Sequence, residues 1–298
     1  MSIAAENLLE LKKEDFRILT AIEVGMRTSQ YVSLESIVEL GKLTLDKVIN
    51  RIDELHKRDL IFRWKGHFIG YQLTHHGYDV LAFKALSERN SIIAVGRELG
   101  KGKESDVIFA FDEKQKTLVA KIHRVGRPSF QRSKKLRGYI GNRGHINWLY
   151  KSRLSAEREW EALQIANKLK LKVPSVIDVS RHIIIMDYYE GTELVNVIDL
   201  KKPENIFNGI INEIRKLFLD GGIIHGDLSE YNIIITPKED FLIIDFPQYE
   251  SSNHPNAKEL LLRDISNICK YFKRKFRIIS DPELILEQIM EDYEKRKK

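Results

Sequence analysis

Short segments with regularly spaced apolar residues fill the first part of the chain. Apolar residues recur every three or four positions in three of them, which predicts amphipathic helices at 15–26, 34–40 and 45–55. Two further runs flank a Lys65-Gly66 turn and predict a β-hairpin with strands at 61–64 and 68–73. A closing helix is expected from Thr74 to about Leu86. This order is typical of a winged-helix domain, which we place at residues 1–88.

The third predicted helix is the one that a winged-helix domain presents to a nucleic-acid groove. Thr44 precedes it as N-cap. Its apolar residues are expected to face inward (Leu45, Val48, Ile49, Ile52 and Leu55) and its polar residues outward (Lys47, Asn50, Arg51 and Glu54). The charges of the domain cancel, with 12 Lys or Arg between residues 12 and 84 and 12 Asp or Glu between residues 6 and 79. Such a surface suits a protein partner as well as a nucleic acid.

From about residue 89 the apolar runs are those of buried strands and longer helices. Strands are expected around 92–99, 107–111, 118–121, 183–186, 233–235 and 241–244. Helices are expected at 146–169, 257–272 and 282–298. The chain is therefore of the α+β class, with a second domain at 89–298.

The segment Ile224-His225-Gly226-Asp227-Leu228-Ser229-Glu230-Tyr231-Asn232 carries most of the candidate chemistry. A strand-like run then delivers Asp245, 13 residues after Asn232. An Asp, an Asn and a second Asp at this spacing are typical of a protein-kinase catalytic loop. Phosphoryl transfer needs a carboxylate that accepts the proton of the attacking hydroxyl, and oxygen ligands for Mg²⁺. We assign Asp227 to the first role and Asn232 and Asp245 to the metal.

A kinase interpretation also demands a phosphate-binding hairpin upstream. Gly100-Lys101-Gly102-Lys103-Glu104-Ser105 lies between two predicted strands, and its glycines allow backbone N–H groups to approach phosphates. The predicted phosphate-binding residues are Gly100, Lys101, Gly102, Ser105 and Val107. The next strand ends at Lys121, whose ammonium can reach the α- and β-phosphates. An ordinary hairpin turn and a surface lysine are the alternatives, and only the spacing favours the kinase interpretation.

Lys121 needs a carboxylate partner, and helical phase selects one. Ala156, Glu159, Leu163 and Ala166 share one face of the helix expected at 146–169. Glu159 is therefore predicted to point inward as the partner of Lys121. Glu157 and Glu161 are predicted to face solvent.

An adenine-binding hinge is expected where the apolar run 183–186 ends. Met186 and the backbone of Asp187 and Tyr189 are predicted to contact the base. The remaining candidates are Glu193 for the ribose hydroxyls, and Ile234 and Ile244 beneath the base. A buried strand that runs into a turn is the alternative here.

These motifs together resemble the RIO kinases, in particular their second, winged-helix subfamily. The resemblance rests on four segments: Gly102-Lys103-Glu104-Ser105, Arg153-Leu154-Ser155-Ala156, the catalytic loop, and Ile244-Asp245-Phe246-Pro247-Gln248 in place of Asp-Phe-Gly. It covers essentially the whole chain. It implies a truncated two-lobed kinase domain, with an N-lobe at 89–186 and a C-lobe at 187–298.

The resemblance also implies an activity and partners. It predicts an atypical serine/threonine kinase or ATPase that uses ATP with Mg²⁺ (or Mn²⁺) and acts in maturation of the small ribosomal subunit. The metal-binding Asp of this family can itself become phosphorylated. Only 53 residues follow Asp245, too few for the activation segment and peptide-docking helices of ordinary protein kinases.

Composition and charge set the remaining expectations. The 298 residues are 43% hydrophobic, and one cysteine, Cys269, excludes an internal disulfide. No run is long and apolar enough for a membrane span, and the N-terminus lacks a signal-peptide core, so a cytoplasmic protein is expected. From Lys121 to Arg153 there are ten Lys or Arg and no Asp or Glu. Its middle, about 125–145, is expected to be a flexible insert that contacts ribosomal RNA.

Two other functions fit parts of the sequence. Aminoglycoside and choline kinases have a similar catalytic loop, but usually also acidic surfaces and larger C-terminal helical regions, which this chain lacks. A ribosome-assembly factor that uses ATP as a conformational clamp with slow turnover has the same motifs as a kinase. The sequence alone does not separate that possibility from protein phosphorylation.

Overall fold

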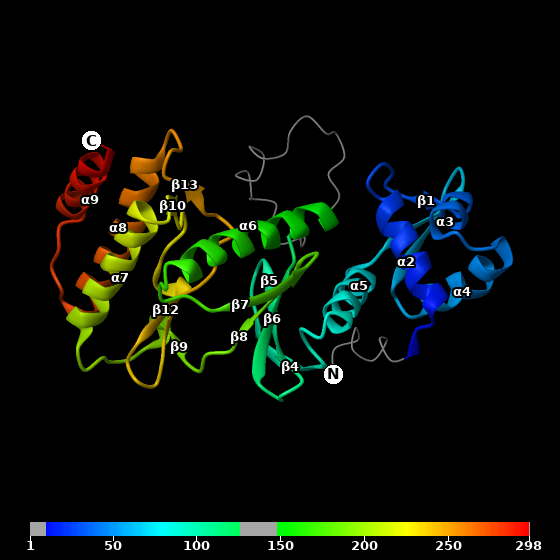
Figure 1. Cartoon of the computed structure of the whole chain (residues 1–298), viewed down its shortest axis with the longest axis horizontal. Helices are drawn as coiled ribbons and strands as arrows, with labels where there is room; N and C mark the ends of the chain where they lie inside the picture. The colour runs from blue at the N-terminus through cyan, green and yellow to red at the C-terminus, as the bar shows by residue number, and fades with distance from the viewer. Residues whose placement is uncertain (1–9, 126–147, 298) are drawn as a thin grey trace. The chain divides into compact units, whose positions relative to one another are not determined.

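A computed structural model describes residues 10–125 and 148–297 of the chain (Figure 1). It contains two compact units, each described by itself below. The first unit comprises Met1–Ala156 and Ile177–Ile185, and the second comprises Glu157–Val176 and Met186–Lys298. The predicted insert at about 125–145 lies almost entirely outside the described residues.

The N-terminal part of the first unit contains the helices and the hairpin that the apolar pattern predicts. Its elements are α2 (Lys13–Gly25), β1 (Val32–Ser33), α3 (Leu34–Gly41), α4 (Leu45–Lys57), β2 (Ile61–Lys65), β3 (Ile69–Leu73) and α5 (His75–Glu88). The three strands form an antiparallel sheet in the order β1-β3-β2. Thr74 caps α5, because its side chain accepts a bond from the N–H of Gly77. Thr44 occupies the N-cap of α4 as predicted, but its side chain makes no capping bond within the described structure.

The orientation of α4 differs from the prediction. Val48, Ile52 and Leu55 are buried, whereas Leu45 and Ile49 are 49% and 47% exposed. The two exposed residues lie along one edge of the apolar stripe of α4, which packs against α2, α3 and β2. Arg51 is not on a free outer face either, because its guanidinium binds both carboxylate oxygens of the buried Asp15 at 2.7 Å. This ion pair ties α4 to α2.

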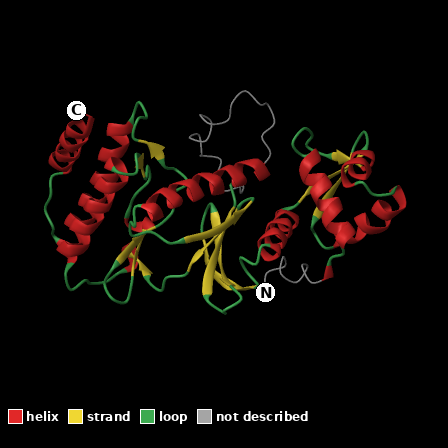
Figure 2. Cartoon of the chain, in the orientation of Figure 1, coloured by secondary structure: helices red, strands yellow, loops and turns green. Residues whose placement is uncertain are grey.

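The remainder of the first unit contains most of a five-stranded sheet (Figure 2). Its strands are β4 (Ala94–Lys101), β5 (Ser105–Phe111), β6 (Thr117–His123), β7 (Val176–Ser180) and β8 (Ile183–Asp187), in the order β4-β5-β6-β8-β7. The ends of β7 and β8 belong to the second unit, and α6 (Trp148–Lys168) continues from the first unit into the second. Strands β4, β5, β6 and β8 match predicted strands and α6 matches the predicted long helix, whereas β7 was not predicted.

Helix α5 is buried on more than one side, and it joins the N-terminal elements to the sheet. Its buried side chains include Tyr78, Val80, Leu81, Phe83 and Leu86. One apolar core runs from α2 through α5 to residues of β5, β6 and β8. A helix that is apolar around most of its circumference needs neighbours on opposite sides. The predicted domain boundary at 88/89 therefore falls at the end of a helix inside one compact unit, and it stays a prediction.

The second unit is built from short strands and three longer helices. Its elements are β9 (Thr192–Glu193), η3 (Leu194–Asn196), α7 (Pro203–Leu219), β10 (Ile223–Ile224), η4 (Glu230–Asn232), β11 (Ile233–Ile235), β12 (Phe241–Ile243), β13 (Glu250–Ser251), α8 (Ala257–Phe276) and α9 (Pro282–Lys297). The strands pair in the orders β12-β11-β9 and β10-β13. Helices α7, α8 and α9 pack beside one another, as Figure 1 shows.

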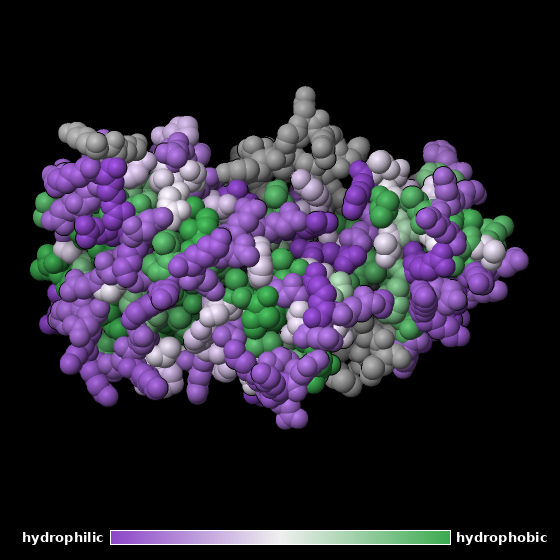
Figure 3. All heavy atoms as spheres, viewed as in Figure 1, coloured by the Kyte–Doolittle hydropathy of each residue, from purple (hydrophilic) through white to green (hydrophobic). Residues whose placement is uncertain are grey.

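Side chains are distributed as expected for a protein that folds around apolar cores. Hydrophilic residues cover most of the face drawn in Figure 3. No helix within the described residues is long and apolar enough to cross a membrane.

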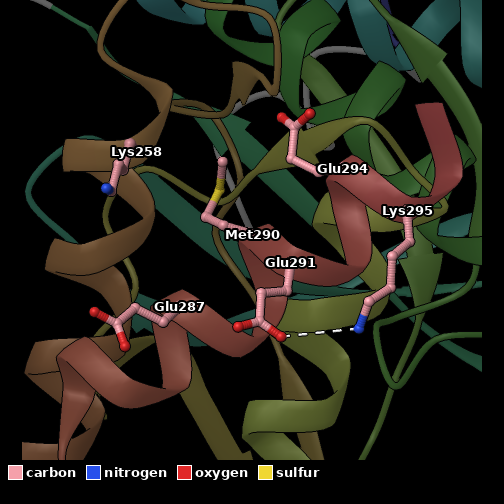
Figure 4. Close-up of a pocket in the computed structure, with 6 residues that line it drawn as sticks. All are labelled: Lys258, Glu287, Met290, Glu291, Glu294 and Lys295. Atoms are coloured by element: carbon pink, nitrogen blue, oxygen red, sulfur yellow. Dashed lines mark ion pairs between the residues drawn. The ribbon is translucent and has the colours of Figure 1, made fainter. Parts of the chain in front are cut away.

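A pocket of about 470 Å³ lies between α8 and α9 (Figure 4), lined by Lys258, Glu287, Met290, Glu291, Glu294 and Lys295. None of the predicted site residues lines it.

The Asp15–Arg51 ion pair yields a stability prediction. Asp15→Asn should lower the free energy of unfolding by about 2 kcal/mol, because the substitution breaks a pair whose carboxylate is fully buried. Asp53→Asn is the matched control, since Asp53 pairs with Arg63 at the surface with 65% of its side chain exposed. Urea unfolding followed by circular dichroism measures both. Equal midpoints for Asp15→Asn and the parent protein would contradict the argument.

Candidate active site

The backbone of the predicted catalytic loop follows β10 and turns sharply at Gly226. Gly226 has φ +79°, and a Cβ there would lie 2.4 Å from the carbonyl oxygen of Gln248. Only glycine is compatible with this position. The turn leaves Asp227, the next residue, exposed to solvent.

Three polar side chains of helix α8 form hydrogen bonds with the backbone of this loop. Asp264 is 1% exposed and accepts bonds from the N–H groups of Gly226 at 2.8 Å and Leu228 at 3.1 Å. Burial raises the pKa of Asp264, although these two bonds and His225 act in the opposite direction. Asn267 donates to the Leu228 carbonyl at 3.0 Å, and Arg263 donates to the Gly226 carbonyl. The loop is thus fixed on both sides of Asp227.

These three residues were not predicted from the sequence, although the position of Asp264 carried a signal. Asp264 lies on the same helical stripe as Leu261, Ile265 and Ile268, which are buried. A carboxylate within an apolar stripe must be satisfied by polar partners inside the protein. Its position therefore indicated a buried backbone segment that needed an acceptor.

The two predicted metal ligands lie in contact. The amide Nδ2 of Asn232 donates to Asp245 Oδ2 at 3.3 Å, and Ser229 Oγ donates to Asn232 Oδ1 at 2.8 Å. The N–H of Ile244 donates to the Asn232 carbonyl at 2.9 Å, which ties the two segments together. Asp245 has φ +74°, a left-handed conformation that non-glycine residues seldom adopt. Such strain is concentrated at functional sites.

His225 and Phe246 connect the loop to the segment that carries Asp245. His225 Nε2 donates to the Ile244 carbonyl at 3.0 Å, and the N–H of Asp227 donates to His225 Nδ1 at 3.4 Å. The ring centroids of His225 and Phe246 are 4.5 Å apart, and Phe246 is fully buried.

The helical-phase argument for Glu159 agrees with the structure. Glu159 is 1% exposed, and its Oε1 accepts a bond from the N–H of Phe246 at 3.3 Å. Glu161 is exposed and accepts from the hydroxyl of Tyr249, while Glu157 is half-buried. Glu159 therefore lies beside Asp245 in the second unit. Its pairing with Lys121, which belongs to the first unit, stays a prediction.

The predicted phosphate-binding residues lie together in the first unit. The hairpin β4–β5 turns at residues 102–104, and the N–H of Gly102 donates to the Ser105 carbonyl at 2.8 Å. Gly100, Val107 and Lys121 are paired across β4, β5 and β6 in one row of the sheet. Val107 and Lys121 therefore point to the same face. Lys121 is 8% exposed.

The structure shows what a side chain would meet at the two glycines of this hairpin. A Cβ on Gly100 would meet no described atom within 4 Å, and a Cβ on Gly102 would lie 3.1 Å from the Ser105 carbonyl oxygen. Neither glycine has a positive φ. The protein fold itself does not require glycine at residue 100, so any requirement there must come from a bound group.

The predicted hinge lies in the second unit, and one of its backbone donors is already bound within the protein. The N–H of Asp187 donates to the Ser175 carbonyl at 2.9 Å, so this donor is engaged within the protein. The hydroxyls of Ser175 and Tyr189 are 3.2 Å apart. Met186 is buried at the end of β8. Glu193 is exposed and pairs with Ile234 across β9 and β11, and Ile244 is half-buried after β12.

The fold and these loops define the chain as a protein-kinase-like protein. Residues 106–284 match the family described as RIO domain, and residues 8–89 match the one described as Rio2, N-terminal. The chain belongs to the RIO kinase family, in its Rio2 branch. This membership confirms the family predicted from the motifs and disfavours a small-molecule kinase.

Named relatives and a solved structure agree with this assignment. The chain is 39% identical to the serine/threonine-protein kinase rio2 of Schizosaccharomyces pombe, over 91% of this chain and 79% of the relative. It is 39% identical to the RIO-type serine/threonine-protein kinase Rio2 of Methanocaldococcus jannaschii, over 87% of this chain and 96% of the relative. The Dictyostelium discoideum relative, serine/threonine-protein kinase rio2, is 36% identical, and the chain spans 54% of its length.

The structure resembles the crystal structure of the Rio2 kinase-ADP/Mg²⁺-phosphoaspartate complex from Chaetomium thermophilum. The TM-score is 0.82 at 33% identity, and the match covers 95% of this chain and 88% of that one. This likeness confirms the predicted fold class, a winged-helix domain followed by a kinase-like domain.

The contacts of α8 predict an effect of Asp264 on turnover. Asp264→Asn removes the charge that two backbone N–H groups share, so the loop around Asp227 should lose its fixed geometry. We expect phosphoryl transfer to fall about tenfold or more, with little change in nucleotide affinity. Glu259→Gln, at an exposed position of the same helix, is the control. Steady-state assays over a range of ATP concentrations measure both values, and unchanged turnover in Asp264→Asn would contradict the anchoring role.

Proposed function

We propose that this protein transfers the γ-phosphoryl group of ATP, with Mg²⁺ (or Mn²⁺) held by Asn232 and Asp245 and with Asp227 as the base. The observation that carries the proposal is the 3.3 Å contact between Asn232 and Asp245 beside an exposed Asp227 on an anchored loop. The relative from Chaetomium thermophilum, whose complex contains ADP and Mg²⁺, supports the choice of nucleotide and metal.

The donor groups fit a magnesium ion that is shared with a nucleotide. No group of three or more His, Cys, Asp or Glu that could hold a metal occurs in the described part of the chain. Magnesium at kinase sites is commonly held by one or two protein oxygens together with phosphate oxygens and water. The bound ion would neutralise charge on the phosphates during transfer. One carboxylate and one amide in contact suit that arrangement.

The remaining residues have roles in orienting the nucleotide. Lys121, oriented by Glu159, is proposed to bind the α- and β-phosphates, and the hairpin from Gly100 to Ser105 is proposed to cover them. Adenine would lie beside Met186 and the hinge. Tyr189 and the carbonyl side of Asp187 would face it, since the Asp187 N–H already donates to Ser175. Glu193 is proposed for the ribose, with Ile234 and Ile244 beneath the base.

Two acceptors are consistent with this site. In protein phosphorylation, a serine or threonine hydroxyl gives its proton to Asp227 and its oxygen bonds to the γ-phosphorus as ADP leaves. In ATP hydrolysis through a phosphoaspartate, an Asp245 carboxylate oxygen bonds to the γ-phosphorus, ADP leaves, and water later cleaves the acyl phosphate. The phosphoaspartate of the Chaetomium relative supports the second route. A slow second step would make the protein an ATP-dependent clamp.

The role assignments predict different phenotypes for the two aspartates. Asp227→Ala should lower phosphoryl transfer by on the order of 10²-fold or more while Mg-ATP still binds. Asp245→Ala should lose transfer and also weaken Mg-dependent nucleotide binding, because Asp245 is the one of these two aspartates that is proposed to touch the metal. Single-turnover labelling with γ-labelled ATP and equilibrium binding measure the two effects. Normal turnover in Asp227→Ala would refute its role.

The same labelling distinguishes the acceptors. A phosphoaspartate is labile to hydroxylamine, whereas phosphoserine is stable in acid. Label that depends on precursor particles of the small subunit and is stable in acid supports protein phosphorylation. Hydroxylamine-labile label on the protein itself supports the clamp.

We further propose a role in maturation of the small ribosomal subunit in the cytoplasm, with contact to ribosomal RNA. The support is the family and the acid-free stretch from Lys121 to Arg153. The middle of this stretch lies outside the described residues, and we propose Ser129 and Ser133 within it, which lie near basic residues in the sequence, as sites of self-phosphorylation. A protein partner for the N-terminal domain stays open, and the exposed Leu45 and Ile49 of α4 favour it.

The RNA contact yields a salt-dependence prediction. Replacing Arg132, Lys134, Lys135 and Arg137 by Gln should leave ATP binding nearly intact and weaken binding to small-subunit RNA. Each lost phosphate contact should lower the slope of log affinity against log salt by about one. Filter binding at several salt concentrations tests this. An unchanged slope would assign the RNA surface to another part of the chain.

A further inference from the structure

One buried arginine in the first unit binds carboxylates from two distant parts of the chain. Arg124 follows β6, and its guanidinium is 8% exposed. Its two terminal nitrogens each lie 2.6 Å from an oxygen of Asp79 on α5, and its Nε donates to Asp106 Oδ2 of β5 at 3.0 Å. The pairing with Asp79 is bidentate, the strongest geometry available to an arginine and a carboxylate.

The backbone of the same residue binds the turn of the phosphate-binding hairpin. The N–H of Arg124 donates to the Glu104 carbonyl at 2.7 Å. Asp106, held by the side chain of Arg124, pairs in the sheet with Ile122, the residue after Lys121. Arg124 therefore grips the returning arm of the hairpin at Glu104 and at Asp106, on either side of Ser105.

His182 completes the group around Asp79. Its Nε2 lies 2.8 Å from Asp79 Oδ1, and its ring stacks on Tyr78 of α5 with centroids 4.4 Å apart. Burial lowers the pKa of His182 to about 4, so the ring is neutral at pH 7 and donates to Asp79. Burial would raise the pKa of Asp79, but the bonds from His182 and Arg124 outweigh it and lower that pKa to about 2. Asp79 is thus ionised and held by two donors.

Asp79 holds both terminal nitrogens of Arg124. A buried guanidinium needs counter-charge along its whole donor edge, and the Asp106 bond engages Nε alone. If Asp79 lost its charge, the terminal nitrogens would have to turn toward water or toward Asp106. Either movement would change the geometry of the bond between Arg124 Nε and Asp106, which holds the hairpin.

We propose that Asp79 and Arg124 are positioning residues for nucleotide binding, through which the N-terminal domain sets the phosphate-binding hairpin next to Lys121. This inference rests on the proposed function. The N-terminal domain then contributes to nucleotide affinity itself, in addition to any partner that it binds.

The test compares Asp79→Asn with Glu23→Gln in the full chain. Glu23 on α2 forms a bidentate pair with Arg181 at 2.9 and 2.8 Å, and Arg181 also donates to the Leu81 carbonyl of α5. This second pair also joins the N-terminal elements to the sheet, because Arg181 lies in the turn between β7 and β8 and binds Glu23 on α2 and the Leu81 carbonyl on α5. It therefore controls for loss of an ion pair between these parts.

We expect Asp79→Asn to weaken binding of ADP with Mg²⁺ by on the order of tenfold, with a smaller change in the rate of single-turnover transfer at saturating ATP. Arg124→Lys should behave alike, because lysine keeps the charge but cannot bind Asp79 and Asp106 together. Glu23→Gln should bind nucleotide like the parent protein. Circular dichroism first verifies that each variant is folded, and calorimetry then measures its affinity for the nucleotide. Hydrogen exchange of peptides covering residues 98–107 reports on the hairpin.

Asp106→Asn provides a second test if Asp79→Asn does not fold. It releases the hairpin but keeps the Asp79–Arg124 pair, so it should weaken nucleotide binding and speed hairpin exchange without loss of the N-terminal fold. Parent-like affinity and exchange in Asp106→Asn, or equal losses in Asp79→Asn and Glu23→Gln, would overturn the inference. A parent protein that binds no Mg-nucleotide would instead refute the proposed function.

Discussion

The catalytic segment depends on a buried carboxylate that accepts two backbone N–H groups. Asp264 binds Gly226 and Leu228, the neighbours of Asp227 on both sides. An irregular loop cannot satisfy its own backbone donors in the way a helix or a sheet does, so it needs an acceptor from elsewhere. Helix α8 supplies that acceptor from a position where burial already disfavours a charge. The free-energy cost of burying this charge is offset by the two hydrogen bonds, which fix the loop and leave Asp227 exposed to solvent.

Local patterns predicted those parts of the site that lie within one element or one motif. Glu159 could be selected over its neighbours because a helix with one apolar stripe leaves a single inward phase. Asn232 and Asp245 could be paired because their spacing belongs to a motif with a known mechanism. Most helices and strands followed from the apolar period in the same way, but β7 and α7 were not predicted. Each of these inferences needs only the residues of one segment.

Contacts between segments could not be predicted in this way. The α4 stripe contains five apolar residues, and only packing against α2, α3 and β2 determines that Leu45 and Ile49 stay exposed. Asp264 is 36 and 38 residues from the amides that it binds. Nothing in a local period reports which distant backbone a buried carboxylate satisfies. The engagement of the Asp187 N–H by Ser175 is a contact of the same kind.

Strain at Asp245 shows how the fixed loop and the segment that carries Asp245 depend on each other. A non-glycine residue at φ +74° costs on the order of 1–3 kcal/mol, so the neighbouring contacts must hold it. Ile244 N–H binds the Asn232 carbonyl on one side, and Phe246 N–H binds Glu159 on the other. Both contacts are backbone donors, so the conformation does not depend on the charge of Asp245. The contacts that fix the backbone thereby place the carboxylate beside Asn232, with Oδ2 at 3.3 Å from the amide nitrogen.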